Sequence, residues 1–262
     1  MRIGRRYRDL ISRARWQRLR VARLTGGYDG WLPGDPLPAG ALDCRLAANE
    51  YGVYCFPRAA SRRAVPRTLA RSQVYERATL ELMMRTAPDA DVVHAGTFIG
   101  DFLPALSRSR TGGARVFAFE PNRESYRCSM VTILLNDLRN VEMANAGLDA
   151  GAGTNRLLIG GGTSRLIDDA PAAGDSEEVR LVRIDEAVDA ERRVGLIHLD
   201  IEGHEQQALT GAMDTIRRWR PLILAETVPA EEWLQEHLLP LGYALSGKVN
   251  GNRIIAPGAR AS

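Results

Sequence analysis

A regular alternation of short apolar strands with helical stretches, beginning at Asp91, constrains the fold of this chain more than any other feature. Helical stretches lie between most of the strands, and the clearest follow Asn122 and Gly203. Alternation of this kind is typical of a parallel sheet with helices on both faces. It predicts an α/β fold with a doubly wound, mostly parallel sheet. The expected strands are Val92–Ala95, Val116–Phe119, Val141–Ala146, Ile197–Asp200, Leu222–Ala225, Tyr243–Ser246 and a last one near Arg253–Ala256.

The chain before Asp91 is organised differently. Residues 1–24 contain nine arginines and one acid, and their apolar residues fall at helical spacing, which predicts a basic amphipathic helix. Glycine and proline then dominate up to residue 43, as expected for an extended arm. We therefore expect an N-terminal basic helical extension and arm at 1–43, ahead of the folded part.

Residues 44–90 are predicted to lead into the core through a hairpin and a helix. Arg45–Ala48 and Val53–Phe56 are the expected strands of the hairpin. The expected helix covers Pro66–Thr86, with the proline near its start. The remainder, 91–262, is the predicted cofactor-binding and catalytic domain.

Two interpretations of the basic segment stay open. It is a solvated arm that packs on its own domain, which we favour, or it attaches to an acidic partner or peripherally to an anionic membrane surface. Nucleic acid is not expected as a partner, because no interleaved aromatic platform follows the arginines. The sequence has no apolar run of about 20 residues, and its three cysteines lack CxxC spacing, which indicates reduced thiols. We expect a cytoplasmic protein whose only contact with the inner face of a membrane would come through residues 1–24.

The first two strands of the alternation end in residues suited to a nucleotide-like ligand. A glycine-rich turn, Gly96-Thr97-Phe98-Ile99-Gly100, follows the first strand. Such a turn lets a ligand approach the backbone and presents helix N-terminal NH groups to it. The second strand ends at Glu120, where a carboxylate can accept hydrogen bonds from ribose hydroxyls. Because ligands of open α/β sheets bind beyond the C-terminal ends of the strands, both features predict one site.

The glycine pattern distinguishes two kinds of cofactor. A nicotinamide-dependent oxidoreductase carries G-x-G-x-x-G, whereas here Phe98 stands between Gly96 and Gly100. The bulk of Phe98 leaves less room for a pyrophosphate, and S-adenosylmethionine has none. The oxidoreductase is kept as the alternative, and binding of S-adenosylhomocysteine against NAD would separate the two.

The densest polar cluster follows the fourth strand of the alternation, in Asp200-Ile201-Glu202-Gly203-His204-Glu205. A helix N-terminus explains part of it, because His204 can begin the helix and Glu205 suits the helix dipole. An ordinary cap does not need Asp200, Glu202 and His204 together, so we interpret the cluster as functional. Glu226, which closes the next strand, adds a carboxylate to the same rim.

Taken together, these segments resemble the FkbM family of S-adenosylmethionine-dependent methyltransferases. The D-x-E-G-x-E run at 200–205 is the most family-specific piece, and the resemblance spans about residues 70–257 in the family's order. The other matching segments are Val92–Phe102, Val116–Asn122, Ile197–Ala212, Pro221–Glu226, Gln73–Glu76 and Arg183–Glu186.

The resemblance implies a class I methyltransferase fold, which is Rossmann-like, and methylation with S-adenosyl-L-methionine as the cofactor. It implies a hydroxyl acceptor on a sugar, a glycan or a secondary metabolite, and therefore an O-methyltransferase. A non-catalytic binding module on the same fold is a further alternative, against which the retained polar cluster argues. The residues expected to bind the cofactor are Glu76, His94, Gly96, Thr97, Phe98, Gly100, Asp101, Glu120, Asn122 and Asp200.

His94 departs from the family, which usually has an acid at the end of the first strand. In class I methyltransferases that acid commonly receives the methionine ammonium of the cofactor, whereas a histidine accepts a hydrogen bond only when it is neutral. Either the backbone carbonyl of His94 and a neighbouring acid take over, with Asp101, Glu76 or Asp200 as candidates, or the cofactor sits differently. The simplest interpretation is that a neutral His94 hydrogen-bonds within the site.

Methylation of a hydroxyl needs a group that removes its proton, because an alcohol is a poor nucleophile. His204 or Glu202 is the predicted base, and Asp200 orients the cofactor or the base. A divalent cation held by Asp200, Glu202 and Glu226 is the alternative activator, and we rank the metal-free mechanism ahead of it. The stretch Gly160–Arg165 is either a loop on the acceptor side or a surface turn.

Overall fold

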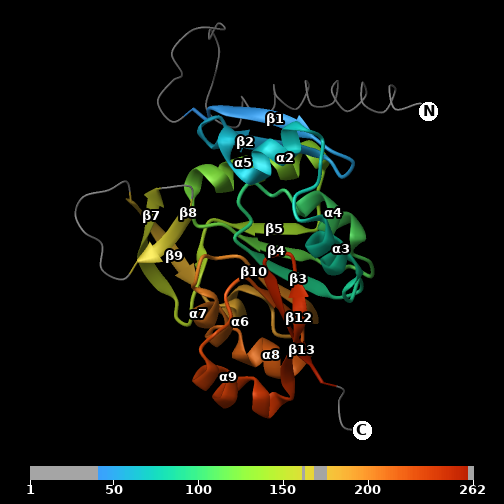
Figure 1. The fold of residues 1–262 in the computed structure, drawn as a ribbon, viewed down its shortest axis with the longest axis vertical. Coiled ribbons are helices and arrows are strands. Elements are labelled where there is room, and N and C mark those ends of the chain that lie inside the picture. The colour runs from blue at the N-terminus through green and yellow to red at the C-terminus, as the bar shows by residue number, and fades with distance from the viewer. Residues whose placement is uncertain (1–40, 161–162, 168–175, 259–262) are drawn as a thin grey trace, which may run out of the picture.

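The core of the protein is one seven-stranded sheet (Figure 1). The structure is a computed structural model that describes residues 41–160, 163–167 and 176–258. The predicted basic helix in 1–24 and the arm up to residue 40 lie outside the described residues. The strand order is β12-β13-β11-β10-β3-β4-β5, in which β13 runs antiparallel to both of its neighbours, β11 and β12, and the other neighbouring strands pair in parallel. The predicted doubly wound, mostly parallel sheet is therefore confirmed. The strands are β3 (Asp91–Ala95), β4 (Val116–Phe119), β5 (Val141–Ala144), β10 (Val194–Leu199), β11 (Leu222–Ala225), β12 (Tyr243–Val249) and β13 (Asn252–Pro257).

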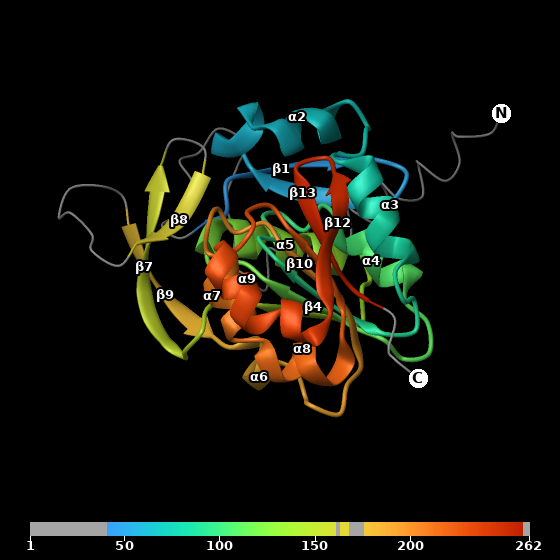
Figure 2. The same cartoon turned by 60° about the horizontal axis from the view of Figure 1, so that its bottom comes forward.

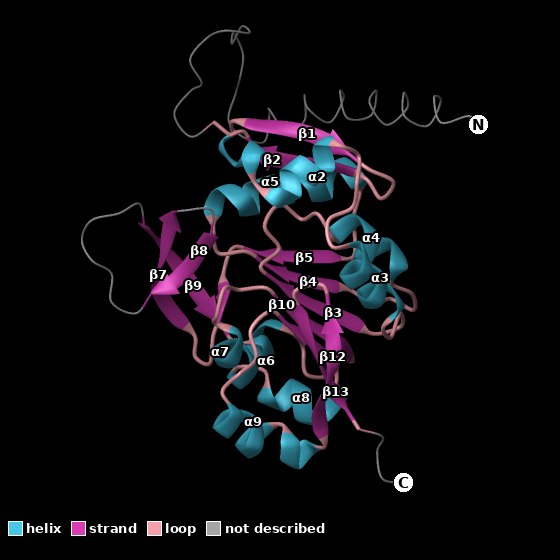
Figure 3. Cartoon of the chain, viewed as in Figure 1, coloured by secondary structure: helices cyan, strands magenta, loops and turns pink. Residues whose placement is uncertain are grey.

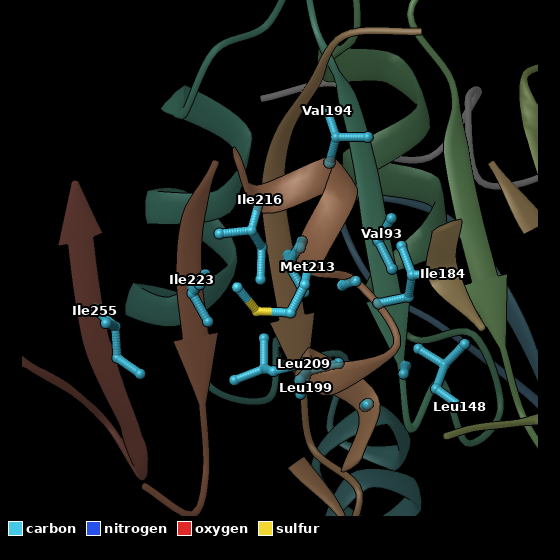
Figure 4. Packing of buried hydrophobic residues seen from close by; sticks show 14 of the residues in the cluster. Val93, Leu148, Ile184, Val194, Leu199, Leu209, Met213, Ile216, Ile223 and Ile255 are labelled. Atoms are coloured by element: carbon cyan, nitrogen blue, oxygen red, sulfur yellow. The ribbon is translucent and has the colours of Figure 1, made fainter. Parts of the chain in front are cut away.

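Both faces of this sheet are covered by helices, because successive strand residues point to opposite faces. Val93, Ile197 and Ile223 belong to one buried cluster, whereas Val92 and Leu196 belong to the other. Figure 4 shows the first cluster from close by. The helices that pack into it are α6 (Ile184–Ala187), α7 (Glu205–Thr210), α8 (Met213–Trp219) and α9 (Glu231–His237), and those on the opposite face are α3 (Arg77–Arg85), α4 (Leu103–Ser109) and α5 (Arg123–Asn136).

A hairpin and short helices form a further layer on α5 (Figure 3). The predicted hairpin is confirmed as β1 (Cys44–Ala48) and β2 (Val53–Pro57), which pair in an antiparallel manner. Its anchor is Asn136 of α5, whose side chain exchanges hydrogen bonds with the backbone of Val53. A 3₁₀ turn, η1 (Ala59–Arg62), follows β2.

The single helix predicted over Pro66–Thr86 is wrong. The chain forms α2 (Ala64–Ala70) and then α3, and between them Ser72 and Glu76 adopt left-handed backbone angles, with φ of 57° and 41°. Helical periodicity could not reveal this break, because its cause is distant in sequence. The Glu76 side chain accepts a hydrogen bond from Asn252 at the start of β13, 176 residues away. Figure 2 shows the β12–β13 hairpin reaching this end of α3.

Our prediction also missed a second sheet, which stands to one side of the core (Figure 1). It contains β6 (Gly147–Leu148), β7 (Gly153–Gly160), β8 (Thr163–Ile167) and β9 (Ser176–Val182), in the order β6-β9-β7-β8. The alternation of Val179 and Leu181 with polar residues was the available signal, since both side chains are buried against Leu157. The stretch Gly160–Arg165 is the connection between β7 and β8, and its residues 161–162 lie outside the described part.

Candidate active site

A cavity of about 260 Å³ opens at the C-terminal ends of the parallel strands. β3 has β4 on one side and β10 on the other, so the connections that leave these strands diverge and leave a crevice. The ends of β3, β4, β10 and β11 line the cavity, together with β6 and β7. The start of α2, the turn before α3 and the β12–β13 turn complete its wall. Parts of the chain that are distant in sequence thus meet at the C-terminal edge of the parallel strands, where we expected a ligand to bind.

The glycine turn after β3 forms one wall. Gly96 lines the cavity with a φ of 75°, and a Cβ atom at this position would stand 1.8 Å from the backbone oxygen of Asp200. Only glycine lets these two strand ends lie so close. Phe98 also lines the cavity, while Thr97 and Gly100 lie behind the turn and support it. Two of these four predicted cofactor residues therefore face the cavity directly.

Glu120, at the end of β4, is a buried carboxylate in the cavity wall. Its Oε2 accepts a hydrogen bond from the backbone N–H of Phe98 at 2.7 Å, and its Oε1 accepts one from that of Asn122 at 2.9 Å. Burial raises the pKa of Glu120 to about 7, and the two backbone bonds oppose that rise. Each carboxylate oxygen can accept a further bond, so Glu120 can still receive two ribose hydroxyls. Asn122 lines the cavity beside it and caps α5 through Ser125.

Four carboxylates meet on the opposite side of the cavity, where the ends of β10 and β11 lie next to the turn before α3. Asp200, Glu202, Glu226 and Glu76 all line it. Burial raises the pKa of Asp200, and the neighbouring carboxylate of Glu226 raises it further. Partial burial and Glu226 also raise the pKa of Glu202. This side of the cavity therefore favours a ligand group that carries positive charge.

His204 stands at the N-terminal end of α7 and also lines the cavity. Its Nε2 lies 2.7 Å from Oδ2 of Asp149, and both side chains are largely shielded from solvent. Asp149 follows β6, and its other oxygen accepts hydrogen bonds from the backbone of Ala150 and Gly151. Sequence reasoning identified His204 but missed Asp149, because the aspartate signals only a turn locally.

Besides Thr97 and Gly100, two more of the predicted cofactor residues do not face the cavity. His94 is buried, and its ring lies against His198 and Phe102 instead. The reason is the alternation along β3, which directs His94 to the same face of the sheet as Val92. Asp101 is also absent from the cavity wall, and burial raises its pKa to about 7. Our prediction that these two side chains touch the cofactor therefore needs correction.

Glu205, the last residue of the D-x-E-G-x-E run, has a structural role. Glu205 is buried, and its Oε1 accepts a hydrogen bond from the backbone N–H of Ile201 at 3.2 Å. This bond folds the loop after β10 back onto α7, which holds Asp200 and His204 at the cavity.

Within the described residues, no three histidine, cysteine, aspartate or glutamate side chains come together as ligands for a metal ion. Asp200, Glu202 and Glu226, which we considered for that role, share a cavity wall without forming such a group. Nor does any helix in the described ranges combine the length and apolar character needed to cross a membrane.

The sheet order, the antiparallel strand β13 inserted beside the edge, and the acid-lined crevice together define a class I methyltransferase, which uses S-adenosylmethionine. More particularly, the chain belongs to the FkbM methyltransferase family. Residues 91–241, more than half of the chain, match the family model described as "Methyltransferase FkbM domain". This match confirms the family resemblance seen in the sequence.

Several solved structures are similar at low sequence identity. Methyltransferase FkbM from Methylobacillus flagellatus KT is 18% identical over 64% of this chain and 44% of that chain, with a TM-score of 0.47. A SAM-dependent methyltransferase from Aquifex aeolicus is 12% identical over 69% and 88%, with a TM-score of 0.39. M. jannaschii TYW2 in complex with AdoMet is 13% identical over 84% and 86%, with a TM-score of 0.45. The chain thus spans less than half the length of the Methylobacillus protein, and no curated protein matches it.

Proposed function

We propose that this protein transfers the methyl group of S-adenosylmethionine to a hydroxyl group of a sugar, a glycan or a secondary metabolite. One observation carries the choice of a hydroxyl acceptor: the His204 imidazole in the cavity wall is bonded to the Asp149 carboxylate at 2.7 Å. A carboxylate-bound imidazole is suited to remove the proton of a weakly acidic alcohol. The sugar or glycan character of the acceptor rests on the family resemblance.

The residues present fit this cofactor. Glu120 offers two buried carboxylate oxygens for the ribose hydroxyls, and Gly96, which lies directly against the backbone of Asp200, brings the ends of β3 and β10 together at the cavity. The carboxylates on the opposite wall complement the cationic methionine end. When bound, the cofactor supplies an electrophilic methyl group on a sulfonium, and the protein must orient the acceptor oxygen in line with it.

His204 performs the proton transfer in this proposal. Asp149 accepts the hydrogen on Nε2 and so fixes the tautomer that leaves a lone pair on Nδ1. Within the described residues Nδ1 makes no hydrogen bond, so it is free to accept the acceptor's proton. With the cofactor bound, which would supply the methyl group and take up the electron pair of the broken S–C bond as a thioether, His204 would hold the proton released as the acceptor oxygen is methylated. The Asp149 carboxylate then stabilises the imidazolium. Glu202, which is exposed, is the second candidate base.

The proposal is tested by incubating the protein with methyl-labelled S-adenosylmethionine and a panel of hydroxylated sugars, glycan precursors and secondary metabolites. We expect label to appear on an acceptor oxygen. In a parallel thermal-shift experiment, S-adenosylhomocysteine should stabilise the protein and NAD should not. Stabilisation by NAD alone would instead support the nicotinamide-dependent oxidoreductase. Binding of S-adenosylhomocysteine with label found only on carbon or nitrogen would retain the methyltransferase and refute the hydroxyl acceptor.

A metal-free mechanism predicts that chelation leaves activity intact. We expect treatment with EDTA to change turnover by less than about twofold, because a positioned base replaces the Lewis acid in acidifying the hydroxyl. The measurement is initial rate with and without chelator, followed by addition of Mg²⁺ or Mn²⁺. Loss of activity on chelation and its recovery with either ion would assign the activation to a cation at Asp200, Glu202 and Glu226.

A further inference from the structure

A line of hydrogen-bonded side chains connects the interior of the sheet with the cavity. His94 of β3 and His198 of β10 are paired in register, and their Nδ1 atoms lie 2.9 Å apart. His198 Nε2 lies 3.2 Å from Oδ1 of Asn252, and Asn252 Nδ2 donates to Oε2 of Glu76 at 3.1 Å. The first three side chains are buried, and Glu76 lines the cavity.

The chemistry of each group fixes the direction of all the hydrogen bonds in this line. An ionised Glu76 can only accept, so Asn252 must turn its NH₂ toward Glu76 and its oxygen toward His198. His198 must then carry its hydrogen on Nε2, which leaves Nδ1 as the acceptor for His94. Burial lowers the pKa of both imidazoles, that of His198 to about 4, so both are neutral at neutral pH. His94 is therefore protonated on Nδ1.

Glu76 lines the cavity with one carboxylate oxygen bonded and the other without a partner among the described residues. Its backbone adopts a left-handed conformation with a φ of 41°, an arrangement that persists only where surrounding contacts impose it. Oε2 accepts a hydrogen bond from Asn252, and the Thr79 hydroxyl lies 3.1 Å from it while sharing its one hydrogen with Oδ1 of Asn250 at 2.9 Å. Oε1 has no hydrogen-bond partner among the described residues, and Gly251 beside it has no side chain to fill the space.

The other two acids that could replace the missing acid at the end of β3 are less suited. Asp101 does not reach the cavity wall, and burial together with the neighbouring Glu226 raises the pKa of Asp200, which disfavours its ionised form. Burial and the nearby Glu226 raise the pKa of Glu76, while the bonds from Thr79 and Asn252 oppose that rise and favour the ionised carboxylate. Glu76 thus combines a free oxygen in the cavity with fixed donors behind it.

We propose that Glu76 binds the ammonium group of the S-adenosylmethionine that the proposed function requires. Asn252, which is hydrogen-bonded in turn to His198 and through it to His94, is then the positioning residue that orients the Glu76 carboxylate toward this group. His94 then supports the site from behind, and the acid that binds the ammonium comes from the turn before α3. The departure of this chain from its family at position 94 is compensated by a line of residues from four separate segments.

Calorimetry with two ligands tests the first half of the proposal. S-Adenosylhomocysteine carries the ammonium group, whereas 5′-methylthioadenosine has the same nucleoside and thioether but no amino acid. Glu76→Gln should weaken binding of S-adenosylhomocysteine about ten- to hundredfold, as expected for a charge-assisted hydrogen bond. Its affinity for 5′-methylthioadenosine should change less than about twofold, as should both affinities in the matched control Glu232→Gln, an exposed residue of α9. Equal losses for both ligands, or none, would overturn the assignment of Glu76.

A double-mutant cycle tests the second half. Asn252→Leu keeps the size of the side chain but removes the donor to Glu76, and should weaken binding of S-adenosylhomocysteine about three- to tenfold. Because Asn252 acts through Glu76, the double variant should bind no more weakly than Glu76→Gln, within about twofold. Additive losses would show that Asn252 acts independently of Glu76 and would overturn its positioning role.

Nitrogen-15 NMR of the wild-type protein tests, without any substitution, which ring nitrogen of His94 and of His198 is protonated. The chain contains only four histidines, so their ring signals are few. We expect His198 protonated on Nε2 and His94 on Nδ1, and the reverse assignment would overturn the positioning line. Failure of the wild-type protein to bind S-adenosylhomocysteine would refute the proposed function itself. Binding by the wild type with undiminished binding by Glu76→Gln would refute only this inference.

Discussion

Replacement of His204 by alanine is expected to lower the single-turnover rate of methyl transfer by about 10²–10⁴-fold, the range typical for loss of a general base. The imidazole lines the cavity and is bonded to Asp149, so its loss removes the proton acceptor and the partner of Oδ2 of Asp149. Asp149→Asn should cause a smaller loss, because the amide can present either its oxygen or its NH₂ to Nε2 and no longer stabilises the imidazolium. The measurement is rapid mixing of enzyme and labelled cofactor with the acceptor in excess.

Affinity for S-adenosylhomocysteine should be almost unchanged in His204→Ala, which separates a catalytic role from a binding role. His237→Gln is the matched control, since His237 is partly buried on α9, where its Nδ1 lies 3.1 Å from the backbone oxygen of Trp233 and 4.0 Å from Oε2 of Glu236. Asp200→Asn, in contrast, should impair both binding and turnover, because Asp200 lies against the glycine turn. Full activity in His204→Ala, Glu202→Gln and Asp200→Asn alike would mean that the acceptor is activated elsewhere.

Replacement of Glu120 by alanine is expected to weaken cofactor binding by about 1.5–3 kcal/mol, the range for hydrogen bonds to a charged group. The carboxylate is buried in the cavity wall, and it also holds the backbone N–H groups of Phe98 and Asn122 in place. The variant therefore loses both the ribose partner and the orientation of the glycine turn. Isothermal titration with S-adenosylmethionine gives the affinity.

The control for Glu120 is Glu142→Ala, which removes an exposed carboxylate from the adjacent strand β5. Circular dichroism establishes whether each variant keeps its fold. A Glu120→Ala protein that is folded and binds the cofactor with wild-type affinity would remove Glu120 from the site. A pronounced loss for Glu142→Ala as well would mean that the effect follows from weakening this edge of the sheet.

Local patterns were sufficient to determine the sheet. The strands predicted at Val116–Phe119 and Leu222–Ala225 have the observed limits, because a short apolar run between polar ends is a local property. Helix limits were determined less well. The periodicity of the segment from Pro66 to Thr86 continues through a break whose cause, the contact of Glu76 with Asn252, joins residues 176 positions apart.

The sequence by itself determined that the ends of β3, β4, β10 and β11 meet at the cavity, since the C-terminal ends of parallel strands share one edge of a sheet. Only the tertiary structure decided which side chains face that cavity. The pleat of β3 turns His94 toward His198 and away from the ligand edge. The second sheet, absent from our prediction, brings Asp149 to His204 across 55 positions of sequence. Strand ends follow from local hydrophobic pattern, whereas the partners of a polar side chain depend on contacts between distant segments that no local pattern encodes.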